Sequence, residues 1–238
     1  MVRIRRQFVL LMRVVWDFLQ GIYAFHLVGP CVTVFGSARL TRQSAIYAEA
    51  YKVGVALGKN HYTVMTGGGP GLMEAASRGA RESGAKCIAC RIRLPFEQSR
   101  NNYIDHSVSF RYFFVRKVML VRHSCALIVL PGGLGTLDEL FEVLTLIQTQ
   151  KISPIPIVFI GREYWQPLFD VVKGMVAAGT ISIAEMDRIS RLMLVTDDVS
   201  EMIAHLKVPT GCLGDSGFSA PGQTVSSDRH TATVKATQ

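Results

Sequence analysis

The sequence predicts a Rossmann-like, doubly wound parallel sheet with helices on both faces, formed by a single α/β domain. Two observations lead to this prediction. Short apolar runs alternate with helical periods from residue 31 to about residue 207, and three of the runs end directly in glycine-containing loops. Strand–helix alternation of this kind is typical of parallel sheets. The apolar content of 49% also favours a globular chain with a buried core.

The expected strands are short apolar runs of the kind that fill a parallel sheet. They cover residues 31–35, 62–65, 87–92, 126–130 and 155–160, with a weaker run at 192–195. Helical periods fill the gaps between them, at residues 43–58, 72–83, 111–123, 136–150, 163–178 and 197–206.

Segments of different character flank the predicted domain, which covers residues 30–207. Residues 1–29 predict an amphipathic helix in which Arg13 and Asp17 interrupt the apolar run, so we expect no membrane span and no signal peptide. Packing on the domain or on a partner is favoured over packing on a membrane surface. Residues 208–238 are rich in Gly, Ser, Thr and Pro and predict a disordered tail.

The net charge of +8 favours anionic partners, namely nucleotides, nucleic acid or an acidic surface. Between residues 85 and 123 there are eight cationic and two acidic side chains, so 8 − 2 gives +6. A nucleic-acid partner is not expected, because no groove-reading or base-stacking element is recognisable. Five cysteines, an odd number, fit a reducing, cytoplasmic compartment. Cys87-x-x-Cys90 places its thiols on opposite faces of a strand, which argues against a metal site.

Loops that follow the predicted strands are expected to form one ligand pocket, because the carboxyl ends of parallel strands share one edge. The binding candidates are listed in chain order: Gly36, Ser37 and Arg39 after the first strand, Gly68, Gly69 and Glu74 after the second, and Gly132, Gly133, Gly135 and Thr136 after the run at 126–130. Glycines let the backbone approach a ligand closely. Glu74 ranks second, since it can simply complement the dipole of its helix. The long connection at 94–110 is expected to be a fourth binding loop.

Thr136 is expected to open a helix whose free N–H groups suit an anion such as phosphate. Glu139 then has two interpretations. Thr136-x-x-Glu139 fits a capping box, in which the glutamate serves only the helix start. Alternatively, the carboxylate points toward a ligand that the glycine turn holds. The residues of this stretch alone leave both open.

Two common nucleotide-binding motifs are absent from the sequence. The pattern G-x-G-x-x-G fails, because the last position is Leu72 when counted from Gly67 and Glu74 when counted from Gly69. No G-x-x-x-x-G-K-[ST] motif occurs either. A nucleoside monophosphate or sugar phosphate therefore suits the pocket better than a large cofactor, and neither a cofactor nor a metal ion is expected.

Three motifs together resemble the LOG family of cytokinin riboside 5'-monophosphate phosphoribohydrolases. They are TGGGPGLMEAA at 66–76, FFVRK at 113–117 and PGGLGTLDE at 131–139. The resemblance covers roughly residues 30–205 and is closer to the longer bacterial branch. It implies hydrolysis of the N-glycosidic bond of a nucleoside 5'-monophosphate to the free base and ribose 5-phosphate. It also implies a homodimer, or a higher multiple of it, formed through the helices around the second and third motifs. An older name for the family, lysine decarboxylase, finds no support in a pyridoxal-phosphate lysine context.

The resemblance also implies roles for particular residues. It makes Arg116 and Glu139 the catalytic pair, and it adds Glu97, Lys117 and Thr145 to the substrate contacts. His106 and His123 are interpreted as structural. Met73, Met119 and Phe114 occur at helical spacing, so we expect their side chains to pack in the core and not to stack on the base of a substrate.

Alternative functions stay open at this point. A nucleotide or phospho-ligand carrier without catalysis fits the same fold, and nucleic-acid binding through the basic middle segment would show a steep salt dependence. The sequence does not choose between AMP, a cytokinin nucleotide and a pyrimidine monophosphate.

Overall fold

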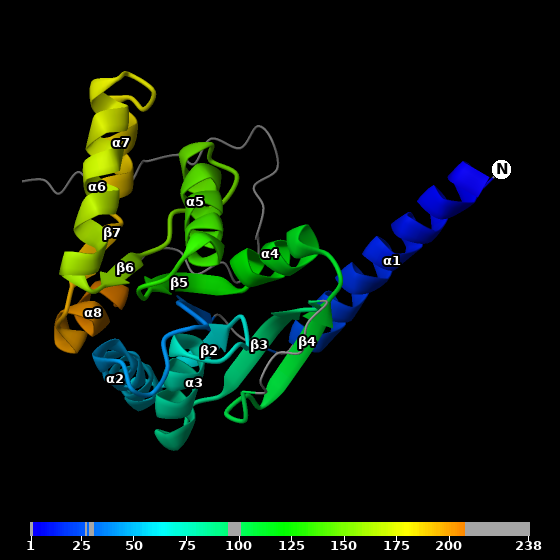
Figure 1. Ribbon diagram of the computed structural model, residues 1–238, viewed down its shortest axis with the longest axis horizontal. Coiled ribbons are helices and arrows are strands. Elements are labelled where there is room, and N and C mark those ends of the chain that lie inside the picture. The colour runs from blue at the N-terminus through cyan, green and yellow to red at the C-terminus, as the bar shows by residue number, and fades with distance from the viewer. Residues whose placement is uncertain (1, 27, 29–30, 95–100, 208–238) are drawn as a thin grey trace, which may run out of the picture.

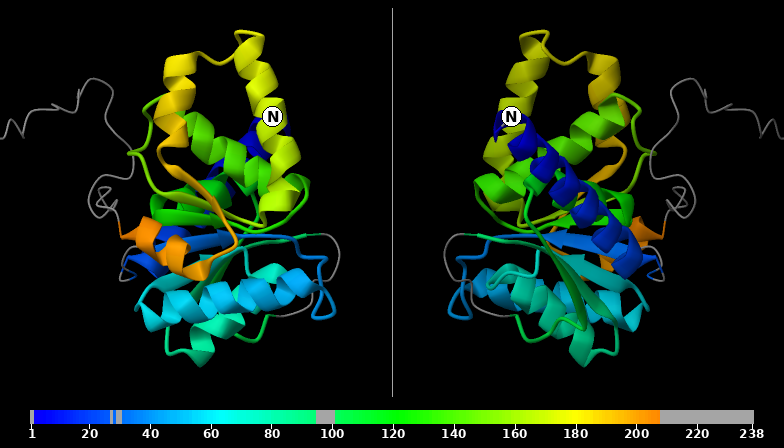
Figure 2. Two further views of the ribbon diagram at one scale, coloured as in Figure 1. Left: turned by 90° about the vertical axis from the view of Figure 1, so that its left-hand side faces the viewer. Right: turned by 90° about the vertical axis from the view of Figure 1, so that its right-hand side faces the viewer.

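The protein is built around one parallel sheet with helices on both faces (Figures 1 and 2). The structure is a computed structural model that describes residues 2–26, 28, 31–94 and 101–207. Within these residues the sheet has seven strands: β1 (Cys31–Phe35), β2 (Thr63–Thr66), β3 (Cys87–Ile92), β4 (His106–Phe110), β5 (Ser124–Val129), β6 (Ile157–Ile160) and β7 (Met193–Thr196). Their order is β4-β3-β2-β1-β5-β6-β7, and all six pairings are parallel. The predicted fold class is therefore confirmed.

Helices divide between the two faces of this sheet. One face is covered by α4 (Phe113–Arg122), α5 (Leu134–Gln148) and α6 (Arg162–Ala177), and the other by α2 (Ala45–Lys59), α3 (Leu72–Glu82) and α8 (Val199–Leu206). The short α7 (Ile183–Ser190) lies beside α5. Side chains alternate along β1, so Phe35 faces the α4–α5 layer and Val34 the α2–α3 layer. An additional helix, α1 (Val2–Phe25), projects from one end of the molecule (Figure 1).

The order of strands reverses beside β1. The chain moves outward from β1 through β2 and β3 to β4, and then returns to place β5 on the other side of β1. In open α/β sheets this reversal leaves a crevice at the carboxyl ends of the two strands, where ligands bind. The topology thus points to the loops that follow β1, β2 and β5.

Predicted and observed boundaries agree to within two residues for the six predicted strands and the six predicted helices of the domain. Two elements were not predicted. The connection at 94–110 was expected to be a loop, but its end forms β4, an edge strand paired to β3. Its polar residues His106, Ser107 and Ser109 hide the apolar pattern, since an edge strand needs few buried side chains. The sequence patterns also did not predict α7, a helix of eight residues that begins with a capping box between Ser182 and Glu185.

Burial tests the remaining core predictions. Cys87 and Cys90 lie in the two different core clusters, which confirms that their side chains face opposite sides of β3. Met119 is buried, as predicted. The prediction for Phe114 was wrong, because this side chain is 52% exposed at the start of α4. Helical spacing cannot tell which side of a first turn meets the sheet.

Backbones of α2 and α3 touch through glycines. A Cβ atom on Gly54 would lie 2.0 Å from the carbonyl oxygen of Ala76, and one on Gly79 would lie 2.1 Å from that of Tyr51. Both obstacles are backbone atoms, which cannot rotate away. The glycines therefore set how closely α3, which follows the second glycine loop, packs on α2.

We expect Gly54→Ala to lower the free energy of unfolding by about 2 kcal/mol, because overpacking pushes two helices apart. The matched control is Gly174→Ala in α6, where a Cβ atom meets nothing within 4 Å. That variant should gain up to about 1 kcal/mol from helix propensity. Urea denaturation measures both values, and equal stability of the two variants would refute the close contact.

Candidate functional site

Loops after β1, β2 and β5 are joined by backbone hydrogen bonds. The amide of Ser37 donates to the carbonyl oxygen of Pro131 at 3.0 Å, and the amide of Leu72 donates to that of Ser37 at 2.9 Å. Gly71 has a φ of +70°, and a Cβ atom there would lie 2.5 Å from the Ser37 oxygen. Only glycine permits this approach. The structure thus brings the three predicted loops together at the strand-order reversal.

Arg116 and Glu139 form a buried ion pair beside these loops. Arg116 belongs to α4 and Glu139 to α5, and their Nη1 and Oε1 atoms are 2.5 Å apart. The exposed fractions of the two side chains are 11% and 5%. Arg116 also donates from Nε to the carbonyl oxygen of Cys90 at 2.8 Å, and its guanidinium lies against Gly67. One arginine thereby joins α4, α5, β3 and the loop after β2.

The second carboxylate oxygen of Glu139 is buried and has no hydrogen-bond partner among the described residues. Burial raises the pKa of Glu139 above its ordinary value of 4.5, while the positive charges of Arg116 and Lys117 oppose this shift. A buried acceptor normally has a partner, so an unpaired one indicates a place for a ligand or a water molecule. The group can accept a proton or a hydrogen bond from such a ligand.

The predicted capping box at Thr136 is wrong. Helix α5 begins two residues earlier, at Leu134, and its N-cap is Gly133 without a side-chain cap. Thr136 lies inside the first turn, where its amide donates to the Gly133 carbonyl oxygen at 2.9 Å. Glu139 is therefore beyond the reach of the cap, and its carboxylate pairs with Arg116 instead. Of the two interpretations of this glutamate, the structure removes the first.

The glycine turn before α5 is crowded at Gly132 and open at Gly133 and Gly135. A Cβ atom on Gly132 would lie 2.1 Å from Thr136 Oγ1, and Tyr164 Oη donates to the Gly132 carbonyl oxygen at 2.8 Å. By contrast, Cβ atoms on Gly133 and Gly135 would meet nothing within 4 Å. Free space thus borders the N-terminus of α5, where unpaired N–H groups suit an anion.

Lys117 of α4 lies next to the ion pair, whereas Thr145 lies further along α5. Lys117 Nζ lies 2.9 Å from Asp138 Oδ1 and 3.3 Å from a carboxylate oxygen of Glu142, so it neutralises acids that flank Glu139. Thr145 is exposed, and its hydroxyl donates to the Phe141 carbonyl oxygen of its own helix at 2.7 Å. It lies six residues beyond Glu139, a rise of about 9 Å. Within this chain the structure does not bring Thr145 to the pair.

Glu74 points away from the pair. Its Oε1 accepts from Arg42 at 2.9 Å and from Tyr47 at 3.3 Å, which fastens the start of α3 to the segment around the start of α2. Gly68 and Gly69 stay at the carboxyl edge, where Gly68 has a φ of +71°. Gly36 packs between Leu130 and Leu72, and the Arg39 amide donates to Ser37 Oγ at 3.1 Å. These loop residues thus lie at the carboxyl edge of the sheet, whereas Glu74 has a structural contact.

Asn101 is a buried polar residue that sequence reasoning did not single out within the 94–110 connection. Its amide nitrogen lies 3.4 Å from the Gly69 carbonyl oxygen and 3.4 Å from Ser77 Oγ, and its exposed fraction is 6%. It therefore holds this connection against the second glycine loop. An Arg-Asn-Asn-Tyr sequence in a long loop was the available signal. Glu97 lies outside the described residues.

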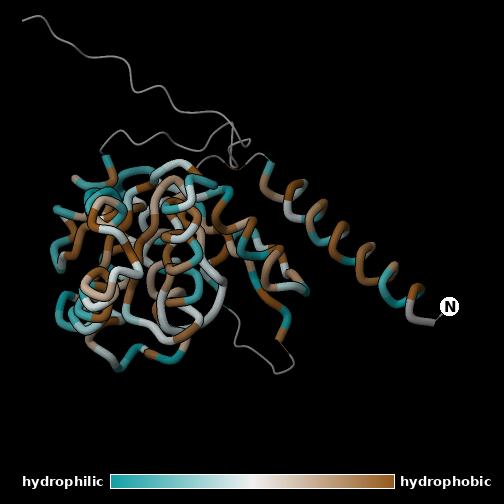
Figure 3. Tube along the Cα trace, turned by 90° about the horizontal axis from the view of Figure 1, so that it is seen from above, coloured by the Kyte–Doolittle hydropathy of each residue, from teal (hydrophilic) through white to brown (hydrophobic). Residues whose placement is uncertain are grey.

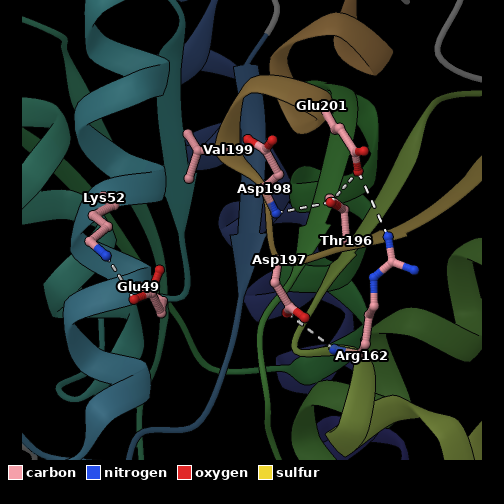
Figure 4. A pocket seen from close by; sticks show the side chains of 8 residues that line it. All are labelled: Glu49, Lys52, Arg162, Thr196, Asp197, Asp198, Val199 and Glu201. Carbon is pink, nitrogen blue, oxygen red and sulfur yellow. Dashed lines mark hydrogen bonds and ion pairs between the residues drawn. The ribbon is translucent and has the colours of Figure 1, made fainter.

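Another pocket, of about 530 Å³, opens between α2 and the turn from β7 into α8 (Figure 4). Its acids are already bonded to the protein. Asp197 Oδ1 accepts from the amides of Gly161 and Arg162 at 2.8 and 3.2 Å, and Asp198 Oδ1 accepts from the Ser200 amide at 2.6 Å. These bonds tie the β6–α6 turn to the β7–α8 turn, so we interpret this pocket as a structural junction.

Fold and site together define an α/β protein with a candidate ligand site at its strand-order reversal. The family model described as "Possible lysine decarboxylase" matches residues 73–206, and the chain belongs to this family, which is the LOG family. The chain is 29% identical over 181 residues to a cytokinin riboside 5'-monophosphate phosphoribohydrolase of Mycobacterium tuberculosis, covering 72% of this chain and 90% of that protein.

Two further comparisons extend this result. The chain is 25% identical over 206 residues to a pyrimidine/purine nucleotide 5'-monophosphate nucleosidase of Escherichia coli, covering 81% of this chain and 44% of that protein. Among solved structures, the molybdenum cofactor binding protein of Rippkaea orientalis matches with a TM-score of 0.55 and 21% identity, covering 76% of this chain and 97% of that one. This structural likeness concerns the fold alone.

We expect Arg116→Met to lower the free energy of unfolding at neutral pH by about 3 kcal/mol, because it leaves a buried carboxylate without its cation. The double variant Arg116→Met/Glu139→Gln should recover part of this loss. The folded-state pKa of Glu139 is raised, so the penalty is small below pH 4.5 and grows as the pH rises through that pKa. Urea denaturation at several pH values tests this.

A matched control is Arg122→Met on the exposed end of the same helix. It should change stability by less than about 0.5 kcal/mol, as surface substitutions do. A loss in Arg116→Met that is independent of pH and undiminished in the double variant would show that burial of Glu139 is not its cause.

Proposed function

We propose that the protein hydrolyses the N-glycosidic bond of a nucleoside 5'-monophosphate and releases the free base and ribose 5-phosphate. The observation that carries this proposal is the Arg116–Glu139 pair, in which the second carboxylate oxygen of Glu139 is buried and has no partner among the described residues. Relatives that are named as phosphoribohydrolase and as 5'-monophosphate nucleosidase support it. AMP and cytokinin riboside monophosphates are the first substrates to consider.

In this proposal the phosphate binds at the N-terminus of α5. Gly133 and Gly135 border free space there, and unpaired N–H groups with the positive end of the helix dipole attract an anion. Glu139 lies five residues beyond Leu134, a rise of roughly 7.5 Å. That spacing places a carboxylate near the ribose when the phosphate lies on the turn.

Glu139 would act on the bond that breaks. As the C1'–N bond lengthens, its electrons move to the base and positive charge develops on the ribose, which a nearby carboxylate stabilises. The same carboxylate can accept a proton from the water that forms the new C1'–O bond, while the departing base takes up a proton from solvent. Arg116 would hold Glu139 in place and bind ribose or phosphate oxygens. Lys117 would balance the surrounding acids.

A homodimer also belongs to the proposal. Phe113 and Phe114 at the start of α4 and Leu134 at the start of α5 are 53%, 52% and 85% exposed. Large apolar side chains grouped on two neighbouring helix starts suit a protein interface. Light scattering of the purified chain measures the mass.

Incubation with AMP and with isopentenyladenosine monophosphate should release free base, detected by chromatography. Glu139→Gln should lower the rate by at least about a hundredfold, because it removes the charge that stabilises the transition state. The control is Glu49→Gln, a partly exposed glutamate of α2 that pairs with Lys52 on its own helix. Tight nucleotide binding without base release in the wild type would instead indicate a carrier and refute the proposal.

The pH dependence provides a separate test. If Glu139 must be ionised, kcat/KM falls as the pH decreases through its pKa, and burial raises that pKa above 4.5. We therefore expect the acid limb of the profile to lie above pH 4.5, and the residual activity of Glu139→Gln to lack this limb. An acid limb that persists unchanged in Glu139→Gln would assign it to another group.

A further inference from the structure

Helix α1 is anchored to the domain through its C-terminal half. Asp17 is fully buried, and its carboxylate binds both the guanidinium and the backbone amide of Arg111 at 2.7 Å. Phe25 is buried in the core, and Gly21 packs against Met119. The N-terminal half extends beyond the domain (Figures 1 and 3). This helix is thus anchored at its C-terminal end, while its N-terminal half projects outward.

A stripe of large apolar side chains runs along the outer side of α1. Its members follow one another at spacings of four or three residues, which keeps them on one side of a helix. They are 41–72% exposed, and the helix positions that face the domain are not among them. The stripe consists of Ile4, Phe8, Leu11, Val15, Leu19 and Ile22.

The exposed charges of α1 are all positive among the side chains described, residues 4–25. Arg5, Arg6 and Arg13 line a surface cavity of about 520 Å³ with Tyr112, while the lone carboxylate, Asp17, is consumed in its buried ion pair. Trp16, 61% exposed, lies beside the stripe. A helix that combines an apolar stripe with basic side chains and an exposed indole ring is typical of helices that bind at membrane interfaces.

We propose that α1 binds the surface of an anionic phospholipid bilayer, with its stripe in the interface and its arginines close enough, across the width of one helix, to be attracted by the anionic headgroups. By length and composition alone, Ile4–Phe25 is able to cross a membrane. Crossing would, however, place Arg13 in the hydrocarbon and break the buried Asp17–Arg111 pair, which a surface position leaves intact. Pairing of two α1 helices would bring arginines together without an available carboxylate. Charge thus favours the bilayer over a second copy.

Sedimentation of the full chain with vesicles tests the proposal without reference to hydrolysis. Binding should be at least about tenfold stronger to phosphatidylcholine vesicles that contain phosphatidylglycerol than to phosphatidylcholine alone, and high salt should release it. Tryptophan emission gives an independent signal. The chain has two tryptophans, of which Trp165 is 2% exposed, so a blue shift on binding reports Trp16. This shift should persist in Trp165→Phe.

Substitutions in the stripe provide the matched comparison. Phe8→Glu/Leu11→Glu should weaken vesicle binding at least about tenfold, because two apolar side chains no longer enter the interface. The control Ile183→Glu makes the same change at a side chain that is 71% exposed on α7, and it should bind like the wild type. Arg5→Gln/Arg13→Gln should weaken both the binding and its salt dependence. Circular dichroism verifies that each variant folds.

Three results would overturn the proposal. The first is failure of the wild type to sediment with anionic vesicles, and the second is sedimentation that the stripe variant leaves unchanged. The third is an oligomer, seen by light scattering, that the stripe variant dissociates, since the stripe would then be covered by a second copy. Retention after high salt and alkaline carbonate would indicate insertion across the bilayer and would equally contradict surface binding.

Discussion

The buried contact between Arg116 and Glu139 is the constraint on which the rest of the site depends. It joins α4, which follows β4 at one edge of the sheet, to α5, which follows β5 beyond the strand-order reversal. A buried ion pair contributes little net stability, since desolvation offsets its attraction. Among the described residues, one carboxylate oxygen of Glu139 also has no hydrogen-bond partner. Stability alone therefore does not account for the pair, and a buried acceptor of this kind marks a place for a ligand or a water molecule.

The glycine turn before α5 and the Arg116–Glu139 pair are connected by the first turns of α5. Tyr164 of α6 fixes the Gly132 carbonyl, Thr136 fills the space that the missing Cβ leaves, and Gly133 begins the helix that carries Glu139. A rigid helix then sets the separation between an anion at its start and the carboxylate further along. Loop flexibility contributes nothing to this spacing. The candidate site is therefore positioned by the N-terminal ends of helices that follow the strands, as is common in α/β folds.

Local patterns predicted most of the fold but less of the site. The runs at 31–35 and 87–92 coincide with β1 and β3, because strands buried on both faces are apolar throughout. The strand β4 was hidden by its polar residues, and the start of α5 by a threonine that imitates an N-cap. The partner of a charged side chain depends on residues that are distant in the sequence. Glu74 and Glu139 both follow glycine loops. Glu74 nevertheless binds Arg42 and Tyr47, whereas Glu139 binds Arg116. Sequence spacing does not encode that difference.

The N-terminal helix is connected to the site more closely than its outward position suggests. Asp17 binds Arg111, and the chain continues from Arg111 directly into α4, where Arg116 lies one turn beyond the helix start. Anchoring of α1 and placement of Arg116 therefore use the same short stretch of chain. A surface that holds the exposed stripe of α1 would leave the Asp17–Arg111 pair intact only if the helix does not cross the bilayer. A membrane contact of this kind would act next to Arg116 without requiring the segment between Arg111 and Arg116 to move.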